Sequence, residues 1–312
     1  MTTIYQMLDL DDAVTYENAK RFGGFTARFV RFADASGRVR VGLADLDSVR
    51  PFPDAFNDLR QIVALDADAL AATIAKLGDE RLPLANVTLK APIVPPKNVF
   101  CIGRNYLGHA EEGARARGEA LVLPAVPTIF TKAPTSIADP GEVLELQARL
   151  SKQYDFEAEL AVVIGTRCRD VSEESALDVV FGYTCINDVT ARDVQKATTQ
   201  WFKGKTLDHT CPMGPWIVPK EAFDDPQAVE VKMRVNGIEK QSAPTSTMIF
   251  SVRRIIAELS AGCTLEPGDV IATGTPEGVG FARTPPEFLK DGDVMEVDIE
   301  RIGVLRNTVH IR

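Results

Sequence analysis

The stretch DFEAELAVVIG, Asp155 to Gly165, decides the predicted fold, because its side chains alternate as they do along a β-strand. One face is apolar and consists of Phe156, Ala158, Leu160, Val162 and Ile164. The other face begins with the acids Asp155, Glu157 and Glu159 and becomes apolar at Ala161 and Val163. Two interpretations of the acids are open at this point: a solvated strand face, which is the commoner case, and half of a metal site.

The composition is typical of a globular protein with one large domain or two modest ones. The chain has 312 residues, of which 45% are hydrophobic and 25% charged, and this excludes disordered and collagen-like proteins. The formal net charge of −9 and the absence of Lys and Arg clusters argue against a nucleic-acid partner. The cysteines are odd in number and form no CxxC pair, which argues against a disulfide framework: Cys101, Cys168, Cys185, Cys211 and Cys263.

The N-terminal sequence MTTIYQMLDLDDAV carries acids where a signal peptide needs basic residues and an apolar core. No uncharged apolar run reaches the roughly 18 residues that a membrane span requires. We therefore expect a cytoplasmic protein that acts on a small molecule and has no membrane partner.

The sequence predicts a small α+β N-terminal domain over residues 1–94 and a larger domain over 95–312. In the first part, 25–30 and 39–43 read as strands. DADALAATIAKLGDE predicts a helix with an apolar stripe of Leu70, Ile74 and Leu77 and with Gly78 at the C′ position. VTLKAPIVPPKN carries Pro92, Pro95 and Pro96, which indicate a boundary or an extended linker.

Strand patterns dominate the second part and do not alternate regularly with helices. We therefore expect a mixed, mainly antiparallel β architecture and not a doubly wound sheet. Asn236-Gly237 predicts a hairpin, and SEESALDVV predicts a short helix capped by Ser172. The expected strands cover residues 99–102, 128–131, 156–164, 181–186, 229–235, 270–273 and 294–299.

A further carboxylate follows the quoted stretch in the segment CINDVTARDVQ. The strand FGYTCI places Asp188 at its C-terminal end. A helix that starts at Val189 or Thr190 would bring Asp188, Arg192 and Gln195 to one side. Carboxylates with a nearby Arg and Gln suit a hard divalent cation such as magnesium. The alternative is that Asp188 caps the helix and that the strand acids are solvated, and spacing alone does not decide between them.

Three further segments carry residues that are candidates for catalysis or ligand binding. In GRNYLGHAEE, His109 and Glu112 lie three positions apart, which suits a base and its orienting carboxylate, although a surface His beside acids is common. In WFKGKTLDHT, Gly204-Lys205-Thr206 resembles a phosphate loop, but Thr199 stands where that motif needs Gly. In IATGTPEGVG, the turn at Gly274-Thr275 can present N–H groups and a hydroxyl to an anion, or can need glycine for the turn alone.

Together these segments resemble the fumarylacetoacetate hydrolase family, from about Pro95 to Asn307. The resemblance is carried by GRNYLGHAEE, PTIFTKAPTSI, DFEAELAVVIG, NDVTARDVQ, GKTLDHTCPMGPWIV, LEPGDVIATGTPEGVG and LKDGDVMEVDIERIG. It implies an α+β, mainly β fold with a mixed β-roll or sandwich, preceded by the small N-terminal domain of the bacterial two-domain members. It also implies a homodimer.

The resemblance assigns roles to residues of this chain. It implies that Glu157, Glu159 and Asp188 hold a divalent metal, magnesium or manganese, with calcium as a further candidate. It implies a water-activating dyad of His109 and Glu112 on a lid, with Lys205 as a further catalytic residue. The substrate-binding residues that it implies are Arg192, Gln195, Gly274 and Thr275.

The function expected from this site is metal-dependent hydrolysis of a carbon–carbon bond in a β-diketo acid such as an acylpyruvate or fumarylpyruvate. A 2-oxo acid decarboxylase, tautomerase or isomerase of aromatic-acid catabolism is the alternative enzyme. A dehydratase or hydrolase of sugar-derived 2-keto-3-deoxy acids belongs to the same group. A non-catalytic binding protein on this fold is the alternative outside enzymes, and metal-dependent turnover of 2-oxo acids distinguishes it.

Overall fold

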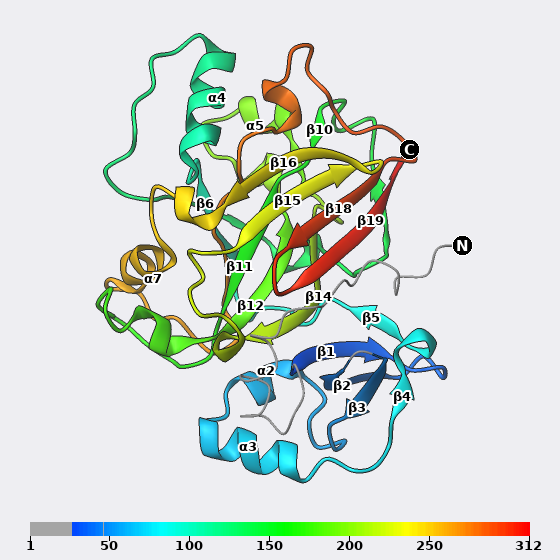
Figure 1. The fold of residues 1–312 in the computed structure, drawn as a ribbon. Coiled ribbons are helices and arrows are strands. Elements are labelled where there is room, and N and C mark those ends of the chain that lie inside the picture. The colour runs from blue at the N-terminus through cyan, green and yellow to red at the C-terminus, as the bar shows by residue number, and fades with distance from the viewer. Residues whose placement is uncertain (1–26, 46) are drawn as a thin grey trace.

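The structure of the protein is a computed structural model that describes residues 27–45 and 47–312. A 12-stranded sheet runs through the molecule (Figure 1). Its main path is β4 (Leu82–Pro83), β3 (Ser48–Pro51), β2 (Val39–Ala44), β1 (Arg28–Ala33), β14 (Cys211–Pro219), β12 (Val180–Asn187), β11 (Ala158–Ile164), β17 (Val270–Ala272), β6 (Val99–Gly103) and β7 (Thr128–Lys132). Two strands lie off this path: β5 (Thr88–Lys90) pairs with β1, and β8 (Ile137–Ala138) pairs with β14.

A second sheet closes the roll against the first. It has five strands in the order β16 (Ile238–Pro244), β15 (Glu230–Val235), β18 (Val294–Ile299), β19 (Gly303–Ile311) and β9 (Val143–Leu146). A short pair of β10 (Tyr154–Asp155) and β13 (Thr190–Ala191) stands apart. Most pairs are antiparallel, and β6–β17, β8–β14 and β9–β19 are parallel. The mixed, mainly antiparallel α+β fold predicted from the sequence is confirmed.

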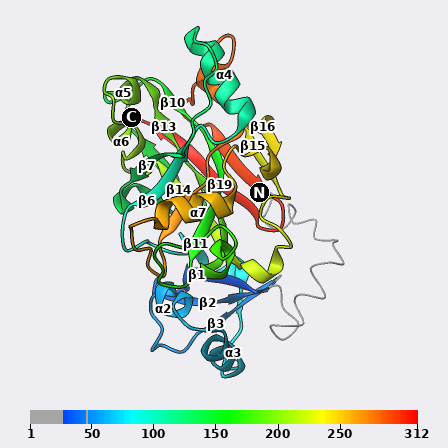
Figure 2. The same ribbon diagram turned by 90° about the vertical axis from the view of Figure 1, so that its left-hand side faces the viewer.

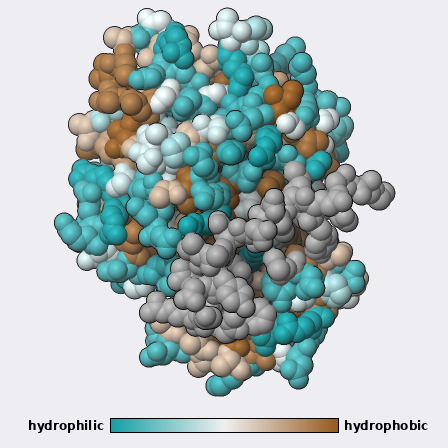
Figure 3. Space-filling model, in the orientation of Figure 1, coloured by the Kyte–Doolittle hydropathy of each residue, from teal (hydrophilic) through white to brown (hydrophobic). Residues whose placement is uncertain are grey.

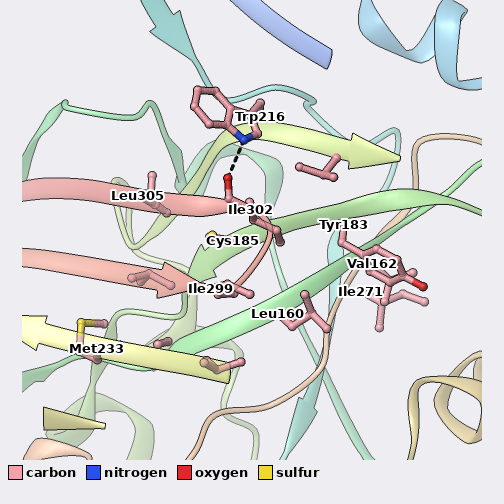
Figure 4. Close-up of a cluster of buried hydrophobic side chains, with 14 of the residues drawn as sticks. Leu160, Val162, Tyr183, Cys185, Trp216, Met233, Ile271, Ile299, Ile302 and Leu305 are labelled. Carbon is pink, nitrogen blue, oxygen red and sulfur yellow. Dashed lines mark hydrogen bonds between the residues drawn. The ribbon is translucent and has the colours of Figure 1, made fainter. Parts of the chain in front are cut away.

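The core between the two sheets is apolar and holds one face of β11. Figure 4 shows Leu160 and Val162 of β11 among side chains from β12, β15, β17, β18 and β19. Ala161 and Val163, on the opposite face of β11, belong to a second apolar cluster that includes Phe29, Leu59 and other residues of the N-terminal part. The alternation read from the sequence therefore buries both faces of this strand, and neither face is solvated.

Residues 28–90 form the small unit at the bottom of Figure 1, with β1 to β5 and two helices. Helix α2 (Leu59–Val63) begins with a capping box of Asp58 and Gln61, and Asp66 caps α3 (Ala67–Ala75). The large sheet continues from this unit through the pairing of Phe29 in β1 with Ile217 in β14. The boundary between residues 94 and 95 stays a prediction.

Two details of the predicted helices are wrong. Helix α3 ends at Ala75 with Lys76 as its C-cap, so the C′ position is Leu77 and not Gly78. The segment that begins at Ser172 forms only the 3₁₀ turn η5 (Ala176–Val179), whose N-cap residue is Ser175. The β-branched Val179 and Val180 lead directly into β12, which leaves no room for a longer helix.

The hairpin predicted at Asn236-Gly237 is confirmed between β15 and β16. Both residues have positive φ, 53° and 74°, as a type I′ turn requires. The remaining α-helices of residues 27–45 and 47–312 are α4 (Leu107–Arg117), α5 (Arg192–Lys196), α6 (Phe202–Lys205) and α7 (Val252–Ser260). Figure 2 shows α4 standing at the top of the roll, well away from the small N-terminal unit. Among the described residues, no helix is long and apolar enough to cross a membrane.

Candidate active site

Three buried carboxylates meet where β11 and β12 pair. Glu157, Glu159 and Asp188 each offer an oxygen, and these oxygens lie within 4.8 Å of one another. The register places Ala158 of β11 opposite Asn187 of β12, so Glu157 and Asp188 are the residues next to this pair on the two antiparallel segments. Their backbones are joined by a 2.8 Å bond from the Asp188 N–H to the Glu157 carbonyl. The interpretation of the acids as a solvated strand face is excluded, because they are 5%, 1% and 0% exposed.

Three cationic side chains face two of these carboxylates. Lys205 donates to Glu157 Oε2 at 2.8 Å and to Asp188 Oδ2 at 2.7 Å. Arg192 forms an ion pair with Glu157 Oε1 at 2.7 Å. Lys132 donates to Asp188 Oδ1 at 2.7 Å. Glu157 and Asp188 are therefore neutralised on both of their oxygens.

Glu159 differs, because the structure gives it no cationic partner within the described part of the chain. Its Oε2 accepts the Gly274 N–H at 2.7 Å. Burial, together with the neighbouring charges of Asp188 and Glu157, raises the pKa of Glu159 well above its ordinary value. Burial also opposes ionisation of Glu157, but Lys205, Arg192 and His109 outweigh it and lower the pKa of Glu157 to about 2. A buried carboxylate without a counter-ion, next to two others, fits a divalent cation that accepts oxygen ligands.

The turn after β17 is shaped to present its N–H to Glu159. Gly274 has a φ of +99°, and a Cβ atom there would lie 2.7 Å from the Asn105 Cβ. Asn105 is fully buried and donates to the carbonyls of Thr273 at 2.7 Å and Phe250 at 3.0 Å. Glycine at 274 is therefore required for both the left-handed backbone and the close approach of Asn105. The sequence left open whether this turn presents N–H groups to an anion or needs glycine for its backbone alone. In the structure both hold, because the Gly274 N–H donates to the Glu159 carboxylate.

His109 and Glu112 form a hydrogen-bonded pair on α4. The His109 Nδ1 lies 2.8 Å from Glu112 Oε1, and both side chains are buried. The second oxygen of Glu112 accepts the Gly278 N–H at 2.8 Å, so the turn after β17 also orients this carboxylate. His109 is near enough to Glu157 for its charge to lower the pKa of that carboxyl. The arrangement suits a histidine base that a carboxylate holds in one orientation.

The predicted start of the helix after Asp188 is wrong. Thr190 and Ala191 pair with β10, and α5 therefore begins only at Arg192. Asp188 lies before this helix and does not cap it. Arg192 and Gln195 do share a side of α5, and the Arg192 guanidinium donates to Gln195 Oε1 at 3.3 Å.

Asp155 is separated from the other two acids of the quoted stretch. The strand is broken at residues 156–157, between β10 and β11. Asp155 accepts the N–H groups of Gly280 and Phe281 at 2.7 and 3.0 Å and bonds the Arg192 Nε at 2.8 Å. It therefore anchors Arg192 and lies outside the three-carboxylate cluster.

The Gly204-Lys205 pair has a packing explanation in place of a phosphate loop. A Cβ atom at Gly204 would lie 2.5 Å from the Gln195 backbone nitrogen, so glycine allows α6 to approach α5. This contact brings Lys205 to the carboxylates, where it is 2% exposed. Burial opposes its charge, but Asp188 and Glu157 raise the pKa of Lys205. The lysine is therefore a cation in this site.

Thr275 is buried beside the carboxylates and its hydroxyl is fully engaged. It donates to the Ala158 carbonyl at 2.9 Å and accepts from the Gln241 amide at 2.7 Å. Its role as a substrate contact, like that of Gly274, Arg192 and Gln195, stays a prediction.

Two buried residues near the site were not singled out from the sequence. Lys132 lies within the quoted block PTIFTKAPTSI, where a lysine that ends an apolar strand was the available signal. Gln241 accepts the Ala158 N–H at 3.0 Å and donates to Thr275 and to the Pro276 carbonyl. It comes from an exposed hairpin and left no signal in the sequence.

Comparison with known proteins places the chain in a family. Residues 98–310 match the model of the fumarylacetoacetate (FAA) hydrolase C-terminal domain. The chain is 47% identical over 235 residues to oxaloacetate tautomerase YisK of Bacillus subtilis, covering 75% of this chain and 77% of that protein. It is 40% identical over 255 residues to the mitochondrial oxaloacetate tautomerase fahd2 of Xenopus laevis, covering 80% and 78%.

A solved structure with a similar fold is that of a fumarylacetoacetate hydrolase from psychrophilic Exiguobacterium antarcticum. It superposes with a TM-score of 0.79 at 44% identity and covers 92% of this chain and 100% of that chain. The match extends over nearly the whole chain and so includes both the roll and the site. The chain belongs to the fumarylacetoacetate hydrolase family.

Proposed function

We propose that the protein is a divalent-metal-dependent tautomerase that interconverts the enol and keto forms of a 2-oxo dicarboxylic acid of the oxaloacetate kind. Two relatives at 47% and 40% identity are oxaloacetate tautomerases. The activity of these relatives favours tautomerisation of a 2-oxo acid, the alternative expected from the sequence, over carbon–carbon bond hydrolysis. The observation that carries the proposal is the buried His109–Glu112 pair, at 2.8 Å, beside the three-carboxylate site.

The metal ligands in this proposal are Glu157, Glu159 and Asp188, for magnesium or manganese, with calcium as a further candidate. Oxygen ligands of this kind suit a hard cation, and Glu159 has no cation partner in the described chain. The cation, when bound, supplies positive charge that stabilises an enolate. Lys205 and Arg192 add fixed positive charge on the same side.

The chemical step assigned to His109 is proton transfer at carbon. In the enol-to-keto direction, the enol O–H bond breaks and its proton passes to solvent, the C2=O bond forms, and the C2=C3 double bond becomes single as C3 takes a proton from His109. The reverse direction removes a proton from C3. Glu112 holds the imidazole by Nδ1, so Nε2 is the nitrogen that can exchange the proton with the substrate. No atoms are gained or lost overall, and His109 recovers its proton from solvent.

The substrate-binding roles remain part of the proposal. Arg192 and Gln195 lie together on α5, and the Arg192 guanidinium is anchored by Asp155 and Glu157. We assign them to a carboxylate of the substrate, because a guanidinium matches a carboxylate in shape and charge. Gly274 and Thr275 border the same site from the turn after β17.

Hydrolysis of an acylpyruvate is the second candidate function. The fumarylacetoacetate hydrolase with 44% identity and full coverage favours it. The same His109–Glu112 pair would then take a proton from water, and Lys205 would stabilise the oxyanion that forms when water attacks the distal carbonyl. The two functions differ in product: tautomerisation leaves the carbon skeleton whole, and hydrolysis gives two acids.

We also propose a homodimer in the cytoplasm. An apolar surface patch supports association, since Leu121, Val122, Leu123 and Val126 are 43%, 81%, 47% and 53% exposed. Figure 3 shows brown, hydrophobic atoms at the upper left, over the region that follows α4 in Figure 1. Sedimentation velocity of the wild-type protein and a Val122→Glu variant tests this: a dimer that dissociates in the variant is expected, and a monomeric wild type contradicts it.

The experiment that tests the proposed reaction follows two substrates with manganese or magnesium present. Ketonisation of enol-oxaloacetate is measured by the loss of enol absorbance, and cleavage of acylpyruvates is measured by product identification. Metal-dependent ketonisation without cleavage supports the tautomerase. Cleavage of an acylpyruvate at a higher kcat/KM than ketonisation would instead support the hydrolase.

A further inference from the structure

Lys132 is a buried lysine that the reaction described above does not use. It ends β7, and its side chain is 0% exposed. Its Nζ donates to Asp188 Oδ1 at 2.7 Å and to the Val189 carbonyl at 3.2 Å, and it also contacts the Lys205 main-chain carbonyl. The Thr210 hydroxyl lies 3.5 Å away as a fourth and longer contact, so the three donors of the ammonium are all engaged.

The same carboxylate, that of Asp188, has a different lysine on each oxygen. Lys205 bonds Oδ2 and at the same time Glu157, so its ammonium lies between two of the proposed metal ligands. Lys132 bonds Oδ1, and its other contacts are two main-chain carbonyls and, at 3.5 Å, the Thr210 hydroxyl. Lys205 would thus compete with a metal ion for the oxygens of Glu157 and Asp188. Lys132 bonds Asp188 alone among the three carboxylates and is otherwise held by neighbouring protein groups.

We infer that Lys132 is a positioning residue that fixes both Asp188 and the backbone of Lys205. Its ammonium bonds both the Asp188 carboxylate, a proposed metal ligand, and the main-chain carbonyl of Lys205. It holds Oδ1 of Asp188, while Oδ2 bonds Lys205, whose ammonium also bonds Glu157. This inference rests on the proposed metal site and does not depend on which reaction the enzyme catalyses.

The sign of a mutational effect separates positioning from simple charge balance. A cation beside a metal site repels the metal ion, so removal of an ammonium that acted only as a counter-charge would tighten metal binding. Removal of a group that orients a ligand weakens metal binding, typically by about 10- to 100-fold. Lys132 and Lys205 contact the same carboxylate, and we expect opposite signs for them.

The test measures manganese affinity by titration calorimetry, without substrate, for the wild-type protein and for Lys132→Met and Lys205→Met. The matched control is Lys97→Met. Lys97 donates to the buried Asp269 at 2.6 Å and to the Thr264 carbonyl at 2.9 Å, at the other end of β17. That variant also loses a lysine paired with a buried aspartate and a carbonyl.

We expect Lys132→Met to bind manganese at least about 10-fold more weakly, Lys205→Met to bind it as tightly as wild type or more tightly, and Lys97→Met to be unchanged. Wild-type or tighter affinity in Lys132→Met would overturn the inference. Lys132→Gln, which keeps a donor and loses the charge, is the second variant if Lys132→Met does not fold, with the same expected direction. Failure of wild-type protein to bind manganese would instead refute the proposed metal site, and absence of oxaloacetate turnover would refute only the reaction.

Discussion

Replacement of Glu159 by Gln should stabilise the metal-free protein and at the same time remove its affinity for metal. Glu159 is 1% exposed and lies beside two other carboxylates with no counter-ion in the described chain. Its raised pKa means that ionisation at neutral pH costs folding free energy. At roughly 1.4 kcal/mol per pH unit between its ordinary pKa of 4.5 and pH 7, this cost has an upper limit of about 3.5 kcal/mol. Gln retains an oxygen to accept the Gly274 N–H and carries an uncharged NH₂ group in place of the second oxygen, so the charge is removed.

The expected result is that the order of the two melting temperatures depends on the metal: Glu159→Gln has the higher Tm without manganese, and only wild type gains in Tm when manganese is added. Without metal, the variant unfolds at a higher Tm than wild type, by the equivalent of about 1–3 kcal/mol. With manganese, wild type gains stability and the variant does not, because a charged ligand is missing. Differential scanning calorimetry with and without manganese measures both. Glu296→Gln is the control, since Glu296 is also buried, at 5% exposed, but pairs with Arg306 away from the site.

Two outcomes would refute this reasoning. A lower Tm for metal-free Glu159→Gln than for wild type would show that the Glu159 charge is compensated in the fold. An unchanged gain in Tm on addition of manganese would show that Glu159 is not a ligand.

Three further predictions follow from the site. His109→Ala should lower turnover by about 100-fold or more and keep manganese affinity within a few-fold of wild type, measured by steady-state kinetics and calorimetry; wild-type turnover would remove His109 from the mechanism. The gain in Tm from manganese should increase as pH rises above 4.5. The raised pKa of Glu159 means that the metal-free protein loses stability as pH rises above 4.5, and the metal, which binds the ionised carboxylate, offsets this loss. The stability from Glu157 is lost only as pH falls from 4.5 toward about 2, and a gain independent of pH between 5 and 8 would contradict the prediction. Gly274→Ala should cost about 2 kcal/mol or more in urea unfolding and weaken manganese binding, because φ is +99° and Asn105 leaves no room; Gly78→Ala, with open space around it, is the control and should be neutral.

The central strand and the site acids could be predicted because their signals are local. Alternation from Phe156 to Ile164 predicted a strand with two distinct faces, and the structure has β11 with each face in its own apolar cluster. Asp188 followed from the end of the next strand. The pairing of β11 with β12 brings the acids together, and no pattern in the sequence predicted this pairing; the family resemblance implied only that the three acids share a metal.

The elements that were missed depend on long-range pairing. The nine-residue strand β14 contains Pro212, Gly214 and Pro215 and therefore reads as a turn. It is held in the sheet by β12 on one side and by β1 and β8 on the other. The late start of α5 arises in the same way, because Thr190 and Ala191 pair with β10.

Buried charges were the hardest residues to predict. A lysine at the end of a strand such as Lys132 reads as a surface residue, since lysine is rarely buried unless it is paired. Its partners Asp188, Val189 and Lys205 are all more than 50 positions away in the sequence. The break between Asp155 and Ala158 was also unexpected, because the sequence alternation continues through it. In the structure Asp155 instead binds Gly280 and Arg192.

The most direct test of the account is the ketonisation of enol-oxaloacetate by wild-type protein, with and without manganese, compared with His109→Ala. The account predicts a metal-dependent acceleration that a chelator abolishes and that His109→Ala loses while still binding manganese. No acceleration by metal-loaded wild-type protein, or the same acceleration by His109→Ala, would contradict the proposal that this carboxylate site and its histidine form a tautomerase.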